Sequence, residues 1–596
     1  MKKSDHIRFS AVSIIILTLI ACGGGGGSSE TAPPPTAPAL SMTAQSVKTF
    51  HFSWTAVGGA TEYRLLESPD GSSNYTQVAT ISGSATTYDL SAFLPARINA
   101  NYILQACNAA GCTNSAAFSI TGNLGNAIGY LKASKSNSQV YFGSRIVLSA
   151  DGNTLAVGTS NESSGASGIN GNQNDTSAAA SGAVYVFVRN GNTWLQQAYV
   201  KASNAEAQDR FGFSIALSAD GDALAVGAPY EDSNSTGNNG SQSDNSAVDS
   251  GAVYLFTRNG NTWSQQAYIK ASNASAYNHF GTSVALSSDG STLAAGSPHS
   301  APYELIWPGK SDTYSATYVF TRSSTTWSQQ AIVTSSDVDL EDEFGQTVSL
   351  SADGNTLAVG APGESSSATG INGDENDNSG SWCGAVYVFI RNGNSWSQQA
   401  YIKASNTESW DRFGSSIALS ADSNTLAVGA TGESSSTTEI NGTQNDNSAS
   451  GSGAVYLFSR SSTTWSQQTY VKASNAEAGD GFGYSMSLSA DGNTLAVGVP
   501  DEGSSATGIN GNQGSNAAAQ SGAVYLFRRS DNAWRQQAYV KAPNSEAYDW
   551  FGNSIALSAD GSTLSVGAYG ESSSATGIGG NQSDNSVPNS GAVYLY

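Results

Sequence analysis

A phrase that begins with Phe-Gly returns seven times in this chain, and its spacing constrains the fold more than any other feature. The step is 69 residues, as from Phe142 to Phe211, except for one step of 64; the phenylalanines are Phe142, Phe211, Phe280, Phe344, Phe413, Phe482 and Phe551. Each copy continues with variants of Leu-Ser-Ala-Asp-Gly, Leu-Ala-Val-Gly-Ala-Pro, a long polar stretch and Gly-Ala-Val-Tyr-Val-Phe. A unit of this length with four apolar runs cannot bury its faces alone. The repeat predicts an all-β fold, a seven-bladed β-propeller over residues 122–596.

The repeated phrases resemble those of the FG-GAP repeat family, whose best-known members are the propellers of integrin alpha chains. The resemblance rests on Phe-Gly, on Val-Gly-Ala-Pro as in Val226 to Pro229, and on Gly-Ala-Val-Tyr. It implies a seven-bladed propeller. Many members hold calcium in an Asp-x-Asp-x-Asp-Gly hairpin, but each hairpin here has a single acid, such as Asp220, which forms a turn rather than a metal site.

The two ends of the repeat array predict how the ring closes. The chain ends at Gly591-Ala592-Val593-Tyr594-Leu595-Tyr596, so the last unit lacks its fourth strand. Tyr130-Leu131-Lys132-Ala133-Ser134 matches the fourth strand of the first unit, Tyr199-Val200-Lys201-Ala202-Ser203. We expect residues 129–134 to supply the missing outer strand, which leaves no free sheet edge.

The N-terminus reads as a targeting signal. Lys2, Lys3 and Arg8 precede an apolar run, and Leu19-Ile20-Ala21-Cys22 resembles the lipobox of bacterial lipoproteins. The resemblance implies a lipoprotein signal peptide over residues 1–21, a lipidated Cys22, and a location at the bacterial outer membrane or cell surface. An ordinary secretory signal with a chance cysteine is the alternative. Residues 22–38, rich in Gly, Ser and Pro, form a flexible linker.

Residues 39–121 alternate apolar and polar residues at the period of a β-strand and resemble a fibronectin type III domain. Within them, Cys107 and Cys112 have a hairpin-turn spacing that a disulfide could clamp, and export permits such a bond. Cys383 is left without a partner and is expected to be a buried small residue.

The charge of the chain restricts its partners. With a formal net charge of −22, nucleic acid is excluded, because phosphates would be repelled. The same charge fits an extracellular surface or one that holds cations. We expect a monomer that meets the membrane through its lipid anchor.

Pairs of acids recur in the long loops between the second and third strands of the units, always 13 residues apart. They are Glu162 and Asp175, Glu231 and Asp244, Glu364 and Asp377, Glu433 and Asp446, and Glu571 and Asp584. An Asp also stands two residues before most Phe-Gly pairs, at Asp209, Asp342, Asp411, Asp480 and Asp549. Converging carboxylates suit Ca²⁺, the one cofactor considered. The alternative is that these residues cap turns.

Four tryptophans occur once each, in loops that fall on one face of the predicted ring: Trp307, Trp382, Trp410 and Trp550. Six others recur at the start of the fourth strand and are packing residues. A unique aromatic on a polar loop suits a sugar or a protein partner, although each could tuck into its own loop. These four are the candidate ligand-binding residues.

The function that follows is binding: a surface protein for adhesion or envelope organisation that holds a glycan or an extracellular protein. The alternative is a polysaccharide-active enzyme, a lyase or hydrolase, built on a propeller. Only four histidines occur, and no nucleophile–base arrangement or metal cluster can be assembled from the sequence, so no catalytic residue is assigned. The third hypothesis is that the protein is a purely structural scaffold.

Overall fold

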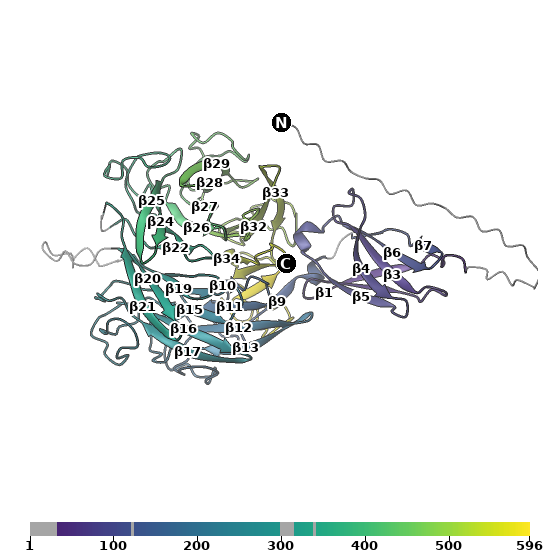
Figure 1. The fold of residues 1–596 in the computed structure, drawn as a ribbon, viewed down its shortest axis with the longest axis horizontal. Coiled ribbons are helices and arrows are strands. Elements are labelled where there is room, and N and C mark those ends of the chain that lie inside the picture. Colours follow the sequence, from purple (N-terminus) through teal and green to yellow (C-terminus); the bar gives the residue numbers. More distant parts are fainter. Residues whose placement is uncertain (1–31, 121–123, 299–314, 338–340) are drawn as a thin grey trace, which may run out of the picture.

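The computed structural model describes residues 32–120, 124–298, 315–337 and 341–596 (Figure 1). Cys22 and Trp307 lie outside these residues. The regular secondary structure of the described residues is β-strand except for two short 3-10 helices, η1 (Leu94–Ala96) and η2 (Leu124–Ala127). None of its helices is long and apolar enough to cross a membrane.

The N-terminal part is a sandwich of two antiparallel sheets. One sheet has the order β1-β2-β5 and the other β4-β3-β6-β7, with β8 paired to β6. The strands are β1 (Leu40–Gln45), β2 (Thr49–Trp54), β3 (Glu62–Ser68), β4 (Thr76–Ser82), β5 (Thr87–Ser91), β6 (Asn101–Asn108), β7 (Gly111–Asn114) and β8 (Phe118–Ser119). Alternate residues of β2 and β6, such as Phe52 and Tyr102, fill the space between the sheets. Cys107 on β6 and Cys112 on β7 are joined by a disulfide.

The repeat array forms seven four-stranded antiparallel sheets among the described residues. In chain order the first three are β10 (Arg145–Leu148), β11 (Thr154–Thr159), β12 (Ala183–Asn190), β13 (Thr193–Val200); β14 (Ser214–Leu217), β15 (Ala223–Ala228), β16 (Ala252–Asn259), β17 (Thr262–Ile269); and β18 (Ser283–Leu286), β19 (Thr292–Ser297), β20 (Ala316–Ser323), β21 (Thr326–Val333).

The next three sheets repeat this plan with the same order of strands. They are β22 (Thr347–Leu350), β23 (Thr356–Ala361), β24 (Ala385–Asn392), β25 (Ser395–Ile402); β26 (Phe413–Leu419), β27 (Thr425–Ala430), β28 (Ala454–Ser461), β29 (Thr464–Val471); and β30 (Ser485–Leu488), β31 (Thr494–Val499), β32 (Ala523–Ser530), β33 (Ala533–Val540).

The last sheet closes the ring. It has the order β34-β35-β36-β9, from β34 (Phe551–Leu557), β35 (Leu564–Ala568), β36 (Ala592–Leu595) and the early strand β9 (Gly129–Leu131). Tyr130 pairs with Tyr594, so the predicted loan of an outer strand from residues 129–134 is confirmed. The inner strands contact one another in a closed cycle, and β10 meets β34 as well as β14. The sheets therefore surround a central axis, as in a β-propeller.

The cores of this ring lie between neighbouring sheets. Val184 and Val186 of β12, for example, share one buried cluster with Leu224 and Val226 of β15. The third strand of each unit is buried on both faces because each sheet is covered by a neighbour on either side, which explains its continuous apolar run. The recurring Trp of the fourth strand joins the packing: Trp263 is buried and donates its indole N–H to Gln197 of the preceding sheet, at 2.9 Å.

The strand ends define two faces of the ring. The short Asp-Gly hairpins lie on one face; there the single acid caps the turn, as where Asp151 accepts the N–H of Asn153. The Phe-Gly phrases and the long loops lie on the other face, which we call the loop face. Gly212 adopts a φ of +88°, and a Cβ there would stand 2.6 Å from the carbonyl oxygen of Ala183. This close approach of two sheets explains why Gly follows Phe.

The sandwich lies beside β9 (Figure 1) and contacts hairpin residues of the last and first sheets. Lys48 donates its ammonium to the carbonyl of Ser562 and to the hydroxyl of Thr563, both in the hairpin of the last sheet. Burial, together with the nearby Arg189, lowers the pKa of Lys48 to about 7. Val47 shares a buried cluster with Leu131 and Leu595. These contacts fix the sandwich to the hairpin of the last sheet, while Thr507, Ile509 and Gly579 of the long loops line a cavity beside it.

Candidate binding site on the loop face

A central cavity of about 530 Å³ opens among the inner strands, and all seven of them contribute to its wall. Half of the lining residues belong to a repeated pair, a hydroxyl residue followed by an apolar one, such as Ser214 and Ile215. The other half includes larger or charged side chains that break the sevenfold repetition: Arg145, Phe213, Glu343, Trp382, Arg412 and Tyr484.

The residue just before each Phe-Gly phenylalanine is held in a left-handed conformation. Its φ lies between +49° and +65° in all seven units, at Tyr141, Arg210, His279, Glu343, Arg412, Gly481 and Trp550. A hydrogen bond to a loop carbonyl accompanies it; the N–H of Arg412, for instance, donates to the oxygen of Trp382 at 3.0 Å. Non-glycine residues pay a steric cost in this region. The backbone here is constant, but the side chain differs in nearly every unit.

We call the unique side chains around the cavity the collar. They line the cavity, contact side chains that do, or belong to the aromatic group around Tyr569, whose hydroxyl feels the charges of Tyr484 and Arg145: Tyr141, Arg145, Arg210, Phe213, Tyr230, His279, Glu343, Trp382, Trp410, Arg412, Tyr484, Tyr548, Trp550 and Tyr569. Their aromatic faces and guanidinium groups gather at one end of an otherwise regular ring. A ring of seven similar units gains no packing advantage from such variety, so the collar is the candidate site.

Two of the predicted tryptophans meet in the collar. Trp382, from the loop between β23 and β24, stacks on Trp410, from the loop between β25 and β26, with ring centroids 6.1 Å apart and planes 8° apart. The guanidinium of Arg412 lies over the ring of Trp382, 5.1 Å from its centroid. Trp410 remains 56% exposed. Trp382 thus covers one face of the Trp410 indole, and much of the rest of that indole is open to solvent.

Trp550 lies in a second aromatic group. It stacks on Tyr569 at 5.0 Å with an interplanar angle of 8°, and Tyr141 meets the edge of Tyr569. Tyr548, beside Trp550, is 55% exposed. The structure therefore places three of the four predicted tryptophans in the collar but divides them between two groups.

The third group is one that sequence analysis missed. Arg145 lies over the ring of Phe213 at 5.4 Å, and Phe213 meets the edge of Tyr230. The guanidinium of Arg210 lies over the ring of Tyr230, 4.8 Å from its centroid. These side chains differ from those at the matching positions of most other units, and that difference is the sequence signal that identifies them.

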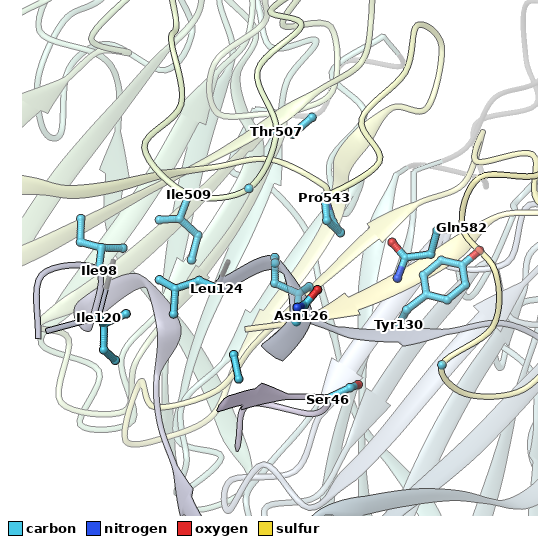
Figure 2. Close-up of a pocket in the computed structure, with 15 residues that line it drawn as sticks. Ser46, Ile98, Ile120, Leu124, Asn126, Tyr130, Thr507, Ile509, Pro543 and Gln582 are labelled. Atoms are coloured by element: carbon cyan, nitrogen blue, oxygen red, sulfur yellow. The ribbon is translucent and has the colours of Figure 1, made fainter. Parts of the chain in front are cut away.

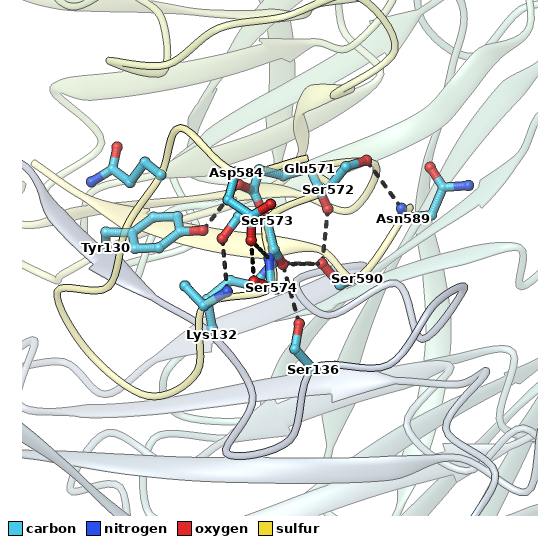
Figure 3. Close-up of polar contacts among 12 residues, drawn as sticks. Tyr130, Lys132, Ser136, Glu571, Ser572, Ser573, Ser574, Asp584, Asn589 and Ser590 are labelled. Atoms are coloured by element: carbon cyan, nitrogen blue, oxygen red, sulfur yellow. Dashed lines mark hydrogen bonds and ion pairs between the residues drawn. The ribbon is translucent and has the colours of Figure 1, made fainter. Parts of the chain in front are cut away.

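The glutamates of the predicted acidic pairs form buried ion pairs. In the last sheet, Glu571 accepts hydrogen bonds from Lys132 at 2.6 Å and from Tyr130 at 2.9 Å, while Lys132 also donates to Ser590 at 2.7 Å (Figure 3). The same Lys–Glu contact recurs in five other sheets, as Lys201–Glu162, Lys270–Glu231, Lys403–Glu364, Lys472–Glu433 and Lys541–Glu502. All these side chains are 5% exposed or less. Each glutamate therefore compensates a lysine charge that the fold buries.

The aspartates of those pairs have different partners. Each accepts the backbone N–H of the serine two residues ahead, as Asp175 does from Ser177 at 3.1 Å; the others are Asp244, Asp377, Asp446 and Asp584. Side-chain hydrogen bonds, from Ser177 first, lower the pKa of Asp175. This is the turn-capping role that was the alternative to metal binding. In the part of the chain that the structure describes, no three His, Cys, Asp or Glu side chains gather as a metal-ligand set.

The aspartates two residues before Phe-Gly are buried next to these ion pairs. Asp209 accepts the N–H of Glu206 at 3.0 Å, and Asp411, Asp480 and Asp549 accept the matching N–H in their units. Burial raises the pKa of Asp209 to about 8, and those of the other three to about 7. They lie beneath the loop face and support the loops that hold the collar.

A second cavity, of about 840 Å³, lies where the sandwich meets the propeller. Figure 2 shows that its wall combines aliphatic side chains, such as Ile98, Leu124 and Ile509, with polar ones, such as Asn126 and Gln582. It brings together none of the collar residues. We therefore treat it as a gap at the domain junction and the loop face as the candidate site.

The repeats identify the family. A model of the FG-GAP repeat matches six segments, residues 194–256, 263–320, 327–389, 396–458, 465–527 and 534–596. These segments make up more than half of the chain, and the chain belongs to the FG-GAP repeat family. Each match runs from the outer strand of one sheet to the third strand of the next.

Comparisons with other proteins add little about the ligand. No curated protein matches the chain. Among solved structures, hydrazine synthase of Kuenenia stuttgartiensis is similar with 12% identity and a TM-score of 0.42, over 76% of this chain and 98% of that one. The WD40 repeats of RRP9 are similar with 10% identity and a TM-score of 0.40, over 78% and 96%. No functional argument rests on likenesses at this level.

Proposed function

We propose that this chain is a binding protein of the bacterial cell surface, held by a lipid on Cys22, and that the collar binds a glycan or an extracellular protein. Its propeller is seven-bladed and integrin alpha-like, and the sandwich, residues 39–121, is fibronectin type III-like. The two-sheet order β1-β2-β5 and β4-β3-β6-β7 supports the second assignment. The protein acts as a monomer at the outer membrane.

The stack of Trp382 on Trp410 carries the proposal. An indole that is 56% exposed leaves a large apolar surface in water, which is unfavourable unless a ligand covers it. The partner ring beneath and Arg412 hold the indole in place, so little conformational freedom is lost when a ligand binds. A flat, rigid and partly exposed aromatic surface suits the face of a sugar ring or an apolar side chain.

The role of the sandwich is to position this surface. Lys48 fixes it to the hairpin of the last sheet, at the end of the strands opposite the collar. An anchor at Cys22 thus leaves the collar open to partners outside the cell.

The test is a binding screen of the full-length chain, purified in a mild nonionic detergent, against glycan and extracellular-matrix arrays. Trp410→Gln is the informative variant, since Gln208 and Gln139 occupy the equivalent position in other units. Loss of an aromatic anchor at a binding hot spot costs about 2 kcal/mol, so we expect affinity to fall by about thirtyfold.

Leu195→Ser is the matched control. Leu195 is 54% exposed on the outer strand β13, far from the collar, and serine occupies that position in four other sheets. Its affinity should equal that of the parent. If Trp410→Gln binds every array ligand as well as the parent does, the collar is not the binding site.

A further inference from the structure

We infer that the central cavity takes the acidic group of an anionic saccharide, with Arg145 as its main ligand and Arg412 as the second. This inference rests on the proposed function and specifies its ligand class. It adds a charge requirement that the exposed tryptophan does not imply.

Arg145 interrupts a belt of hydroxyl groups. The residue three positions after each Phe-Gly phenylalanine is Ser or Thr in six units: Ser214, Ser283, Thr347, Ser416, Ser485 and Ser554. Five of these hydroxyls donate to the carbonyl of the glycine in the next unit, as Ser214 does to Gly281 at 2.7 Å. In the first unit the position holds Arg145, which cannot make this contact. The chain thus gives up one bond of a regular belt to place a guanidinium in the cavity wall.

The surroundings of Arg145 leave its charge available. Its guanidinium lies over Phe213 and donates to the carbonyl of Ser144, which uses one of five N–H groups. Among the described residues it makes no ion pair, whereas six lysines are buried against glutamates. Most other described arginines also lack an ion pair, so what distinguishes Arg145 is its place in the cavity wall.

Arg412 lines the same cavity and lies over Trp382. Glu343 also lines it; burial raises the pKa of Glu343, and Arg412 opposes that shift. The charge of Arg412 is therefore partly balanced by Glu343, while that of Arg145 is not. One net positive charge remains at the cavity, next to polar groups such as Asn553 and Thr431.

The ligand class follows from the combination. A planar guanidinium fork matches the two oxygens of a carboxylate or a sulfate ester. The neighbouring Trp382–Trp410 stack offers a flat surface for the ring that carries this acid. An acidic peptide would satisfy the arginine but makes less use of an open indole face. We therefore assign a uronate-bearing or sulfated saccharide.

The experiment measures binding of hexagalacturonate and of its methyl ester to the full-length chain in detergent by isothermal titration calorimetry. The two probes share the sugar rings and differ in charge. We expect the acid to bind about tenfold more tightly than the ester, with the preference decreasing as salt is added.

Arg145→Ser installs the residue that other units use, so the fold should tolerate it. It should remove the preference, so that the acid and the ester bind with similar affinity. Arg535→Ser is the control: it removes the same charge from an exposed site on the outer strand β33, where serine occurs in four other sheets. That variant should keep the full preference.

Further arms separate the outcomes. A sulfated galactan oligosaccharide that binds in an Arg145-dependent manner keeps the assignment and identifies the acid as sulfate. Tighter, Arg145-dependent binding of poly-L-glutamate would overturn it in favour of an acidic protein. Equal binding of acid and ester, or no effect of Arg145→Ser, also overturns it, while a loss of ester binding in Trp410→Gln would still support the proposed function.

Discussion

Lys132 and Glu571 are 439 residues apart in the sequence and form a buried ion pair with a distance of 2.6 Å between Nζ and Oε2. This contact joins the segment before the first sheet to the loop of the last one. Removing one member of a buried pair leaves an uncompensated charge and costs about 3–5 kcal/mol. We predict that Lys132→Met lowers the free energy of unfolding by about 3 kcal/mol, as measured by urea denaturation.

Lys135→Met is the control for this prediction. Lys135 lies in the same segment but is half-buried, and donates to the carbonyl of Asn174 at 3.3 Å. Its substitution should change stability by less than about 1 kcal/mol. An unchanged urea midpoint in Lys132→Met would show that the closure does not depend on this pair.

The buried aspartates beneath the loop face predict a pH dependence. Burial raises the pKa of Asp209 to about 8 and those of Asp411, Asp480 and Asp549 to about 7, above the usual value of 3.8. Between pH 4 and 7 the folded state therefore holds protons that the unfolded state has released, and stability falls as pH rises. We expect the melting temperature to decrease by a few degrees from pH 5 to pH 8.

Asparagine variants test the origin of that slope. Asn278 occupies the same position in the third unit, so Asp→Asn is a change that the fold already accepts. The fourfold variant Asp209→Asn, Asp411→Asn, Asp480→Asn, Asp549→Asn should show a flatter profile between pH 5 and 8. A profile as steep as that of the parent would assign the effect to other groups.

Cys383 predicts a stabilising substitution. It is buried at the position where five other sheets have a serine that accepts a hydrogen bond from the lysine of the ion pair, such as Ser452 from Lys472 at 2.7 Å. In its own sheet, Lys403 donates to Glu364. Cys383→Ser should supply the missing acceptor and raise stability by about 1 kcal/mol. The reverse change, Ser452→Cys, should lower stability by a similar amount. A lower melting temperature for Cys383→Ser, or a higher one for Ser452→Cys, would contradict this account.

Whether the acidic pairs bind calcium can be tested by measuring the melting temperature. A ligand that binds the folded state raises the melting temperature by linkage. Because Glu364 is paired with Lys403, and Asp377 caps a turn, we expect equal melting temperatures in calcium and in chelator. A clear decrease in chelator would restore the acidic loops as metal sites.

Lipidation of Cys22 is tested by fractionation. We expect Cys22→Ala to move the protein from the membrane fraction to the soluble fraction and to abolish palmitate labelling. Ser28→Ala in the adjacent linker should leave both unchanged. Palmitate incorporation that persists in Cys22→Ala would place the lipid elsewhere or remove the anchor from the proposal.

The architecture was predictable because the same sequence unit occurs seven times, so each copy gives independent evidence for the four strands of one sheet. Seven copies of Phe-Gly give the unit length, and the match between residues 130–134 and 199–203 indicates how the ring closes. The roles of the acids were not predictable, because spacing does not reveal partners. Glu571 meets Lys132 only through ring closure, and its apparent companion, Asp584, hydrogen-bonds within its own loop.

The collar was only partly predictable. Trp382 and Trp410 were found because tryptophan is rare and conspicuous, but their stacking depends on two loops that meet in space. Arg145 occupies a position whose importance becomes clear from the hydroxyl belt, and that belt is a relation between neighbouring units. A single unit of the sequence does not contain it.

The loan of β9 to the last sheet has a mechanical consequence. A pull on the N-terminal side of the chain reaches the propeller through the sandwich and through Gly129–Leu131, where the strand pairs with β36. Lys48 and Val47 tie the sandwich to the last sheet, and Arg189 and Asn192 of the first sheet donate to its Ser91 and Asp89. Tension is therefore shared by the two sheets that flank the seam of the ring, where Lys132 is fixed to Glu571. The strength of this seam then sets the force at which the ring opens.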